Sequence, residues 1–399
     1  MKIALVNNQF QLGGAETVVG QLRRGLVAAG HAVELHVAHG KDYPPDVHPL
    51  YPGLLSRLHH SRFNRMMEKV APRFEWTDAA FRRLAKSDAD IIHLHNFHGD
   101  YATIASLAHV ASHKKLVWTF HALWGVTGGC DHPRACGRYL EKCGDCPQVG
   151  LWAVGDVDHT AAQLEEKLTL LANKPVHVVA PSEWLAEIVR KSKIGSHWDV
   201  RRIANGVDPA AFQPRLRDAG GVATVMIVNR NFSDEQKGFG MALTALRLIH
   251  ASDLKVILVG QNSAWAAAQM PSHFEVLDAG FVEGRAKIAE LYALADIFLF
   301  ASPAENFPCV ILEAMASGCC VVATPSGGVV EQIDHGRSGL LAGEISGESL
   351  AVQLQNALAS GELRAALGQE AAREVIRFFP EKRMIDEYIE LYRVVIGEN

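Results

Sequence analysis

The sequence has no long apolar run and no marked excess of charge of one sign. No stretch approaches the roughly 18 consecutive apolar residues of a membrane-crossing helix. The opening MKIALVNNQFQLGG holds only four apolar residues in a row after its lysine, too few for a secretory signal, so we expect a cytoplasmic protein. With 39 Lys and Arg against 44 Asp and Glu, and a formal net charge of -5, the composition argues against a chain that coats nucleic acid.

Fixed-period repeats and low-complexity tracts are also absent, which argues against solenoid architectures and long disordered regions. Short runs rich in Val, Ile and Leu instead alternate with longer helical patterns, as expected of βαβ units around parallel sheets. The sequence predicts strands near residues 2–7, 32–37, 90–95, 115–120, 175–180 and 198–203, and a second series near 223–229, 254–260, 296–300 and 319–323.

Between the two series lies NGVDPAAFQPRLRDAGG, residues 205–221, whose Asn-Gly, two prolines and glycine pair are typical of a linker. We therefore expect an N-terminal domain over residues 1–205, a linker over 206–221 and a C-terminal domain over 222–380, each doubly wound around its own sheet. The final segment, FFPEKRMIDEYIELYRVVIGEN, predicts an amphipathic helix over 381–399 that could join the N-terminal domain.

The loops after the strands are where parallel sheets bind ligands, because backbone amides and helix N-termini point outward there. After the first strand, NNQFQLGGAE places Gly13 and Gly14 before a helix that starts near Ala15. These glycines would let the backbone approach a ligand closely, and the helix N-terminus would offer N–H groups to an anion. An ordinary glycine-rich turn explains the same loop equally well.

Two basic residues follow the first strand of the second series. The segment NRNFSDEQKGFG places Arg230 and Lys237 in and just beyond one loop, before a helix that begins near Gly238. A guanidinium and an ammonium group that converge there would suit a diphosphate. The alternative is a pair of solvated basic side chains.

The stretch PAENFPCVILEAMASG, residues 303–318, sets two glutamates eight positions apart. Pro308 is predicted at the first helical position, so Glu305 falls in the turn before the helix and Glu313 about a turn and a half inside it. Because Glu313 stands in the apolar run CVILEAMASG, it needs hydrogen-bond donors if it is buried. The hydroxyls of a ribose would supply them.

These motifs stand in the order and at the spacing seen in the retaining GT-B glycosyltransferases of family 4, which the chain resembles over nearly its whole length. The segments that carry the resemblance are LGGAE, TFH, APSEW, IANGVD, NR with KGF, PAENFPCVILEAMASGCCVVAT and PSGGVVE. The resemblance implies an α/β fold of the GT-B type, with two Rossmann-like, doubly wound domains that face a cleft.

The resemblance also implies a role for each matching residue. By this likeness Glu305 would hydrogen-bond the donor sugar, Glu313 would bind the ribose of the nucleotide, and Arg230 and Lys237 would hold the diphosphate. His121, in TFHALW, would lie near the donor sugar. The remaining expected donor-binding residues are Gly13, Gly14, Asn306, Phe307 and Pro308.

The implied activity is retaining transfer of a hexosyl unit from a UDP- or GDP-sugar to a glycan acceptor, in the assembly of bacterial exopolysaccharide, capsule or O-antigen. In such enzymes the leaving diphosphate is thought to take the acceptor's proton, so the protein needs only electrostatic stabilisation and positioning. Two cations and a helix N-terminus could provide both, and no cofactor is expected for catalysis. The acidic DAD at residues 88–90 leads into a strand instead of following one, so we interpret it as structural.

Two other functions remain open. The GT-B fold also serves nucleotide-sugar 2-epimerases, which use the donor without an acceptor. The chain could also be an inactive protein that recognises a nucleotide sugar or a glycan.

An insert follows the TFHALW loop, over residues 124–152, and concentrates four of the seven cysteines. Cys130, Cys136, Cys143 and Cys146 lie within 17 residues, spaced C-x5-C-x6-C-x2-C. In a compartment that keeps thiols reduced, this favours a structural zinc site, with disulfides or free thiols as the alternatives. The other cysteines, Cys309, Cys319 and Cys320, are expected in the core.

Two further segments allow more than one interpretation. Residues 54–86 contain eight Lys and Arg against three Asp and Glu, interleaved with apolar residues, which is typical either of a helix with a solvated basic face or of one that lies on an anionic membrane. A membrane contact would suit a lipid-linked acceptor. His93, His95 and His98 in IIHLHNFHGD could reach one metal ion, but the resemblance favours an acceptor-side or structural loop.

Overall fold

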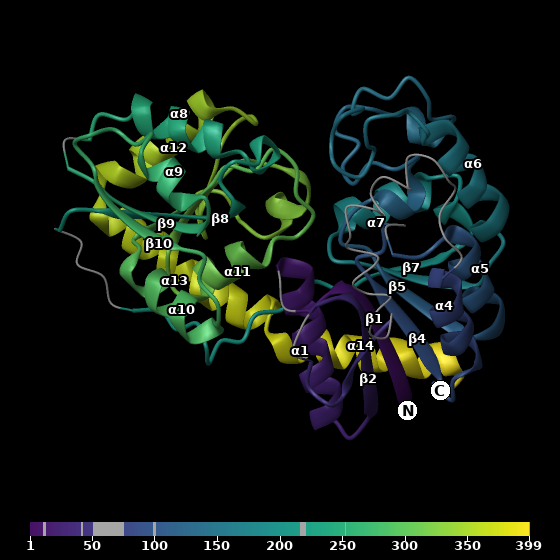
Figure 1. Cartoon of the computed structure of the whole chain (residues 1–399). Coiled ribbons are helices and arrows are strands. Elements are labelled where there is room, and N and C mark those ends of the chain that lie inside the picture. The colour runs from purple at the N-terminus through teal and green to yellow at the C-terminus, as the bar shows by residue number, and fades with distance from the viewer. Residues whose placement is uncertain are drawn as a thin grey trace. The chain divides into compact units, whose positions relative to one another are not determined.

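The computed structural model describes residues 1–10, 13–40, 43–50, 76–98, 101–215, 221–251 and 253–398. The chain divides into two compact units, Met1–Ile203 with Ile385–Asn399, and Ala204–Met384. Each unit is built around its own parallel sheet with helices on both faces (Figure 1).

The first unit contains a seven-stranded sheet in the order β3-β2-β1-β4-β5-β6-β7. Its strands are β1 (Lys2–Gln9), β2 (Ala32–His39), β3 (Val47–Pro49), β4 (Ile91–His95), β5 (Lys115–Thr119), β6 (Val176–Ala180) and β7 (Asp199–Arg202). Its helices are α1 (Gly14–Ala28), α4 (Trp76–Lys86), α5 (Ile104–His113), η1 (Trp124–Val126), η2 (Arg138–Leu140), α6 (Thr160–Leu171), α7 (Glu183–Lys191) and η3 (Gly195–His197).

The central strands of this sheet are buried along most of their length because helices cover both faces. On one face, Val6, Ile92 and Leu94 pack in a cluster with Phe81 of α4 and Leu107 of α5. The other face carries α1 and the last helix, α14 (Glu381–Ile396). Those two helices approach closely, since a Cβ added at Gly25 of α1 would lie 2.2 Å from Ile385 Cδ1.

The second unit contains a six-stranded sheet in the order β10-β9-β8-β11-β12-β13. Its strands are β8 (Thr224–Asn231), β9 (Lys255–Gln261), β10 (Glu275–Gly280), β11 (Ile297–Phe300), β12 (Cys320–Ala323) and β13 (Leu340–Leu341). Its helices are η4 (Glu235–Lys237), α8 (Phe239–Leu248), α9 (Ser263–Ala267), α10 (Arg285–Leu294), α11 (Cys309–Ala316), η5 (Gly327–Glu331), α12 (Gly347–Ala359) and α13 (Gly361–Phe378).

Alternate residues of these strands enter two separate cores, as the two-residue period of a strand requires. Val225 and Leu299 pack in the cluster that includes α8 and α12, whereas their neighbours Met226 and Phe298 pack in the cluster that includes α11 and α13. Figure 1 shows α8, α9 and α12 on one side of this sheet and α10, α11 and α13 on the other.

The strands predicted from the sequence are confirmed, and three further strands, β3, β10 and β13, were not predicted. All three lie at a sheet edge. The helix that was predicted to begin at Pro308 begins one residue later. Pro308 is the residue before α11, with φ −66° and ψ 126°, and not the first helical residue. Within the predicted linker, Val207 and Phe212 are buried in the second unit.

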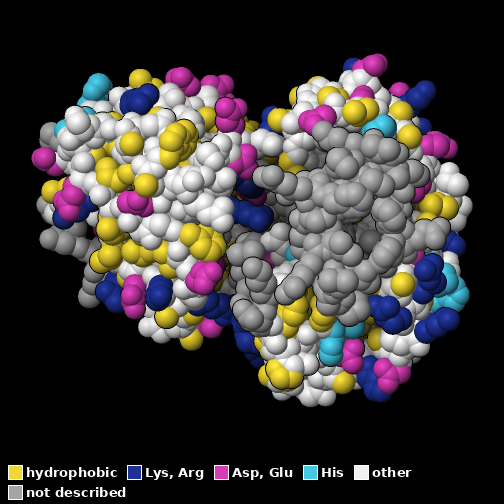
Figure 2. Space-filling view, viewed as in Figure 1, with side chains coloured by type: hydrophobic (Ala, Val, Ile, Leu, Met, Phe, Trp, Pro, Cys, Tyr) yellow, Lys and Arg dark blue, Asp and Glu magenta, His cyan; other side chains and the backbone are white. Residues whose placement is uncertain are grey.

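The exposed surface is mixed in charge. On the viewed face of the second unit, basic, acidic and apolar side chains are interspersed (Figure 2). In the part of the chain that the structure describes, no helix is both long and apolar enough to span a bilayer. Of the basic segment 54–86, residues 54–75 lie outside the described part, and 76–86 form α4.

Candidate active site

The residues predicted to bind the diphosphate and the sugar lie at the point where the second sheet reverses its strand order. Strand β8 has β9 on one side and β11 on the other, so the loops after β8 and β11 leave neighbouring strands in opposite directions. Arg230 stands near the end of β8, Lys237 ends η4, and Glu305 follows β11. Parallel sheets bind ligands at such a switch point, and the sequence brings all three residues there.

Lys237 and Glu305 form the central contact of this loop pair. Lys237 Nζ lies 3.0 Å from Glu305 Oε1, and their side chains are 36% and 20% exposed. Ser302 Oγ donates to the same carboxylate oxygen at 3.1 Å. Glu305 raises the pKa of Lys237, while the nearby charge of Arg230 acts in the opposite direction. The ammonium therefore stays protonated at neutral pH, beside a second cation.

A glycine makes this contact possible. Gly238 directly follows Lys237 in the left-handed region, with φ +76°, and a Cβ there would lie 2.0 Å from the Ala301 carbonyl oxygen. No other residue fits this position without displacing backbone. The close approach holds the end of η4 against the end of β11, which brings Lys237 to Glu305.

Glu313 lies within α11, as predicted, and its side chain is half-buried. Tyr292 Oη lies 3.2 Å from Glu313 Oε2. Burial raises the pKa of Glu313 to about 7, against smaller lowering effects of the Tyr292 hydrogen bond and the charge of Arg285. This carboxyl group is therefore poised between its two protonation states at neutral pH.

The turn between the two glutamates is fixed from within the second unit. Asn306 and Phe307 are buried, and Asn205 Nδ2 donates to the Phe307 carbonyl at 2.8 Å. The Phe307 ring packs edge-on against Phe379, with ring centroids 5.5 Å apart. Asn306 and Phe307 thus have structural contacts, and their predicted role in donor binding stays a prediction.

The first unit has its own switch point, between β1 and β4. Gly13 caps α1 with φ +133°, and a Cβ there would lie 2.8 Å from Glu16 Oε2, whereas a Cβ at Gly14 would meet nothing within 4 Å. Glu16, which the sequence did not single out, accepts from Asn96 Nδ2 at 3.2 Å. This buried carboxylate ties the glycine loop to the end of β4.

His121 lies just beyond β5, and its Nε2 is 3.1 Å from His95 Nδ1. Burial and, to a smaller degree, the charge of His98 lower the pKa of His121 to about 3. His98 Nε2 in turn lies 3.3 Å from Asp131 Oδ1. The histidines 93, 95 and 98 therefore have separate partners and do not converge on one ion in the described structure.

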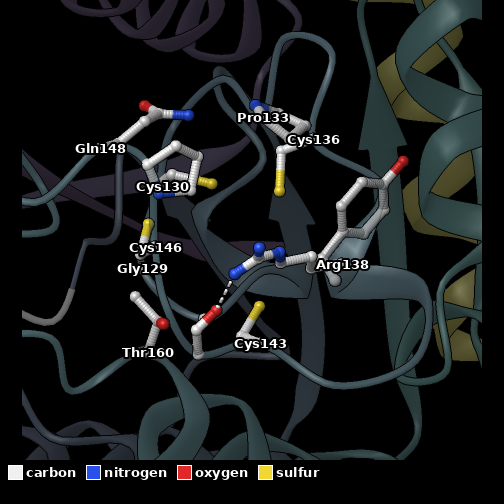
Figure 3. Close-up of a pocket in the computed structure, with 13 residues that line it drawn as sticks. Gly129, Cys130, Pro133, Cys136, Arg138, Cys143, Cys146, Gln148 and Thr160 are labelled. Carbon is white, nitrogen blue, oxygen red and sulfur yellow. Dashed lines mark hydrogen bonds between the residues drawn. The ribbon is translucent and has the colours of Figure 1, made fainter.

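The four cysteines of the insert surround one pocket, between β5 and α6 (Figure 3). Arg138 lines the same pocket and donates to the Gly144 carbonyl at 2.6 Å. All four cysteines of the insert are free thiols, and burial raises the pKa of Cys130 to about 12. No group of three or more Cys, His, Asp or Glu side chains in the described residues is arranged closely enough to hold a metal ion. The zinc site stays a prediction.

Elemental analysis of protein purified without a histidine tag tests the zinc prediction. We expect about one zinc ion per chain, because a segment with so little regular structure gains its order from a cross-link or a metal. Serine in place of both Cys143 and Cys146 should release the metal, while alanine in place of the buried Cys309 should not. A zinc content near zero under reducing conditions, with four titratable thiols in the insert, would contradict the prediction.

The three remaining cysteines lie in the core of the second unit, as expected, with Cys319 and Cys320 fully buried and Cys309 8% exposed. Sequence reasoning missed four supporting residues: Glu16, Asn205, Tyr292 and Ser302. Of these, only Ser302 lies near its partner in sequence, three residues before Glu305, and could have been suggested by local spacing.

Two Rossmann-like units, each a parallel sheet between layers of helices, define a protein of the GT-B class. Residues 12–211 match the family described as Glycosyltransferase Family 4, and residues 223–360 match the one described as Glycosyl transferases group 1. The chain belongs to glycosyltransferase family 4.

The chain is similar along its whole length to known glycosyltransferases. WcaC of Escherichia coli K12, named for a glycosyl transferase of colanic acid biosynthesis, is 23% identical over 98% of this chain and 100% of its own. Sucrose-phosphate synthase of Thermosynechococcus elongatus superposes with a TM-score of 0.74 at 19% identity over 100% of both chains. Anabaena Alr3699/HepE, solved with UDP and glucose, superposes with a TM-score of 0.70 at 17% identity, over 99% of this chain and 100% of that one. At these identities the structural matches establish the fold alone.

Proposed function

We propose that this chain is a retaining hexosyltransferase that moves a sugar from a nucleotide diphosphate donor to a glycan acceptor during surface polysaccharide assembly. The observation that carries the proposal is the contact between Lys237 and Glu305, with Arg230 nearby, at the switch point of the second sheet. A binding surface of this composition offers positive charge to a diphosphate and a carboxylate to sugar hydroxyls.

In this proposal the second unit makes most of the contacts to the donor. Arg230 and Lys237 hold the diphosphate, Glu305 accepts hydrogen bonds from the sugar, and Glu313 accepts them from the ribose. As the glycosidic bond breaks, negative charge grows on the diphosphate, and the two cations stabilise that charge more strongly than they stabilise the intact donor. The acceptor oxygen bonds to the anomeric carbon on the face that the diphosphate leaves and gives its proton to a diphosphate oxygen, so no separate protein base is required. The two cations take the role of a metal.

The first unit is proposed to supply the acceptor side and a few donor contacts. By resemblance, Gly13 and Gly14 would contribute the backbone near the diphosphate, and His121 would meet the donor sugar. A neutral His121 is suited to a hydrogen bond with a hydroxyl group and unsuited to pairing with an anion. The name of WcaC, which refers to colanic acid, supports a polysaccharide as the product.

The test of this function is nucleotide release measured with and without a glycan acceptor. A transferase releases nucleotide and forms a longer glycan only when the acceptor is present. Nucleotide release without any acceptor would favour a 2-epimerase. Binding of UDP or GDP without turnover, across a broad panel of donors and acceptors, would favour an inactive binding protein. A thermal-shift screen identifies the base of the nucleotide first. A nucleotide at 100 times its Kd raises the free energy of unfolding of the protein by about 2.7 kcal/mol.

Nucleotide affinity should depend on pH through Glu313. Its pKa is raised to about 7, so the carboxylate that accepts ribose hydroxyls predominates only above pH 7. If the carboxylate form alone binds, UDP or GDP should bind about tenfold more tightly at pH 8 than at pH 6. Calorimetry at both pH values checks this, and Glu313→Gln is the control that reports the titration of the nucleotide's own phosphate. An equal pH dependence in both proteins would contradict the assignment of Glu313 to the ribose.

The same pKa shift makes the folded protein less stable as the pH rises, whereas nucleotide affinity should increase. Because the folded pKa of Glu313 lies above its ordinary value of 4.5, the stabilising effect is complete below pH 4.5 and is lost as the pH rises through 7. The free nucleotide-binding unit therefore holds this carboxyl group at a cost in stability above neutral pH. Binding of a ribose would offset that cost.

A further inference from the structure

A buried hydrogen-bonded network in the first unit leads towards His121 and is not used by the proposed reaction. His93 Nδ1 lies 2.6 Å from Tyr392 Oη on α14, and His93 Nε2 lies 2.8 Å from Thr119 Oγ1. Thr119 Oγ1 in turn lies 2.8 Å from Tyr388 Oη, also on α14. All four side chains are buried, and both nitrogens of His93 have a partner. The ring of His93 is therefore locked in one orientation.

His95 connects this locked ring to His121. The rings of His93 and His95 pack with centroids 4.1 Å apart, and His95 is fully buried. His95 Nδ1 is hydrogen-bonded to His121 Nε2 at 3.1 Å. Among the residues that the structure describes, none forms a hydrogen bond with the buried His95 Nε2. Within the described part of the chain, Nδ1 is therefore the one hydrogen-bonded nitrogen of His95.

This asymmetry decides which nitrogen carries the proton. Burial lowers the pKa of both histidines far enough to keep them neutral, so each ring has a single N–H. If His121 donated to His95, the N–H of His95 would lie on Nε2 and be buried without an acceptor. If His95 donates through Nδ1, only a lone pair is left unpaired, and orphaned N–H groups are the rarer and more costly case. The second arrangement is therefore favoured.

We infer that His95 is a positioning residue that fixes His121 as the Nδ1–H tautomer, so that His121 presents an N–H donor to an oxygen of the donor sugar. His121 is only partly buried, and its Nε2 is engaged by His95, so Nδ1 is the nitrogen left for a substrate. Tyr388 and Tyr392 of α14 support the arrangement by holding His93 and Thr119. The inference rests on the proposed function only for the identity of the ligand that His121 meets.

The tautomer is measurable without activity. In protein labelled with ¹⁵N-histidine, long-range proton–nitrogen correlations distinguish the protonated ring nitrogen from the bare one, and His121→Gln identifies the His121 signals. The inference requires that Nδ1 of His121 is protonated near neutral pH. Protonation on Nε2 would overturn it, whatever the enzyme does.

Two isosteric variants test the positioning role. Asparagine at position 95 places an amide N–H₂ where Nδ1 lies, whereas glutamine places it where Nε2 lies. His95→Asn should therefore keep most of the activity, and His95→Gln should lower kcat by on the order of tenfold to a hundredfold, with the donor KM changed by less than about threefold. Equal losses in both variants would mean that His95 is merely structural. If neither variant folds, the tautomer measurement on the unaltered protein still decides.

Failure of this inference can be told apart from failure of the proposed function. If the unaltered chain transfers no sugar, the proposed function fails while the tautomer of His121 stays measurable. If His121→Ala transfers at the normal rate, the role of His121 and of its positioning residue is wrong, and the proposed function stands.

Discussion

Lys237→Ala and Arg230→Ala should each lower kcat by on the order of 10² or more. The reason is that charge develops on the leaving diphosphate in the transition state, and these two cations stand at the switch point where the diphosphate is proposed to lie. Part of the effect should appear as weaker nucleotide binding, but the larger part should be in kcat, because the interaction strengthens as the bond breaks. Steady-state kinetics with the identified donor and acceptor measure both.

Two control variants sharpen this experiment. Lys255→Ala removes an exposed lysine of the same unit, whose partner is Glu275 at 3.3 Å, and should leave kcat unchanged. Lys237→Arg keeps the charge but changes its shape, so it should retain more activity than Lys237→Ala. Alanine variants at 230 and 237 that keep full kcat would contradict the proposed electrostatic role.

Alanine variants of the two glutamates in the stretch 303–318 should differ in their effects on nucleotide affinity and on sugar transfer. Glu313→Ala should weaken binding of the bare nucleotide diphosphate, because Glu313 is assigned to the ribose. Glu305→Ala should leave that affinity nearly intact or raise it slightly, because it removes a negative charge beside Lys237, 3.0 Å away. Transfer should nevertheless fall strongly in Glu305→Ala, since the sugar loses its carboxylate partner.

Calorimetry with UDP or GDP and single-turnover transfer assays measure these two effects separately. Glu305→Gln and Glu313→Gln are the matched controls, because each keeps the shape and one acceptor oxygen while it removes the charge. Equal loss of nucleotide affinity in the two alanine variants would mean that the division between sugar and ribose is wrong.

The sequence predicted the central strands well because they are covered on both faces. Strands such as β8 and β11 contain the continuous apolar runs VMIV and IFLF, a pattern that burial on two sides favours. The strands that were missed lie at edges: β10 has mostly exposed or half-buried residues, and β13 has only two residues. An edge strand needs little apolar character, so its sequence resembles that of a loop.

The candidate site was predictable where its residues sit in loops of recognisable composition. Arg230, Lys237 and Glu305 could be named because they lie near or after the ends of predicted strands, and topology alone brings these three to one switch point. Glu313 could be named because it is a charged residue within an apolar helical run. The supporting partners that are distant in sequence could not be named. Tyr292 lies 21 residues before Glu313, and Asn205 lies 102 residues before Phe307, and no local pattern encodes such contacts.

The histidines show the same limit in a different form. The alternation of His93 and His95 along a strand suggested a metal, because the sequence cannot show that β5 and α14 provide their partners. Tyr392 is 299 residues away from His93 in the chain. Only the folded unit distinguishes a ligand set from a buried hydrogen-bonded network.

The measurement that tests the central claim most directly is sugar transfer in EDTA, with the product's anomeric configuration followed by proton NMR. We expect transfer to continue at an undiminished rate without added divalent ions, because Arg230 and Lys237 take the role of a metal at the diphosphate. The new glycosidic bond should keep the donor's configuration. Activity that disappears in EDTA and returns only with Mg²⁺ or Mn²⁺, or a product with inverted configuration, would contradict the account.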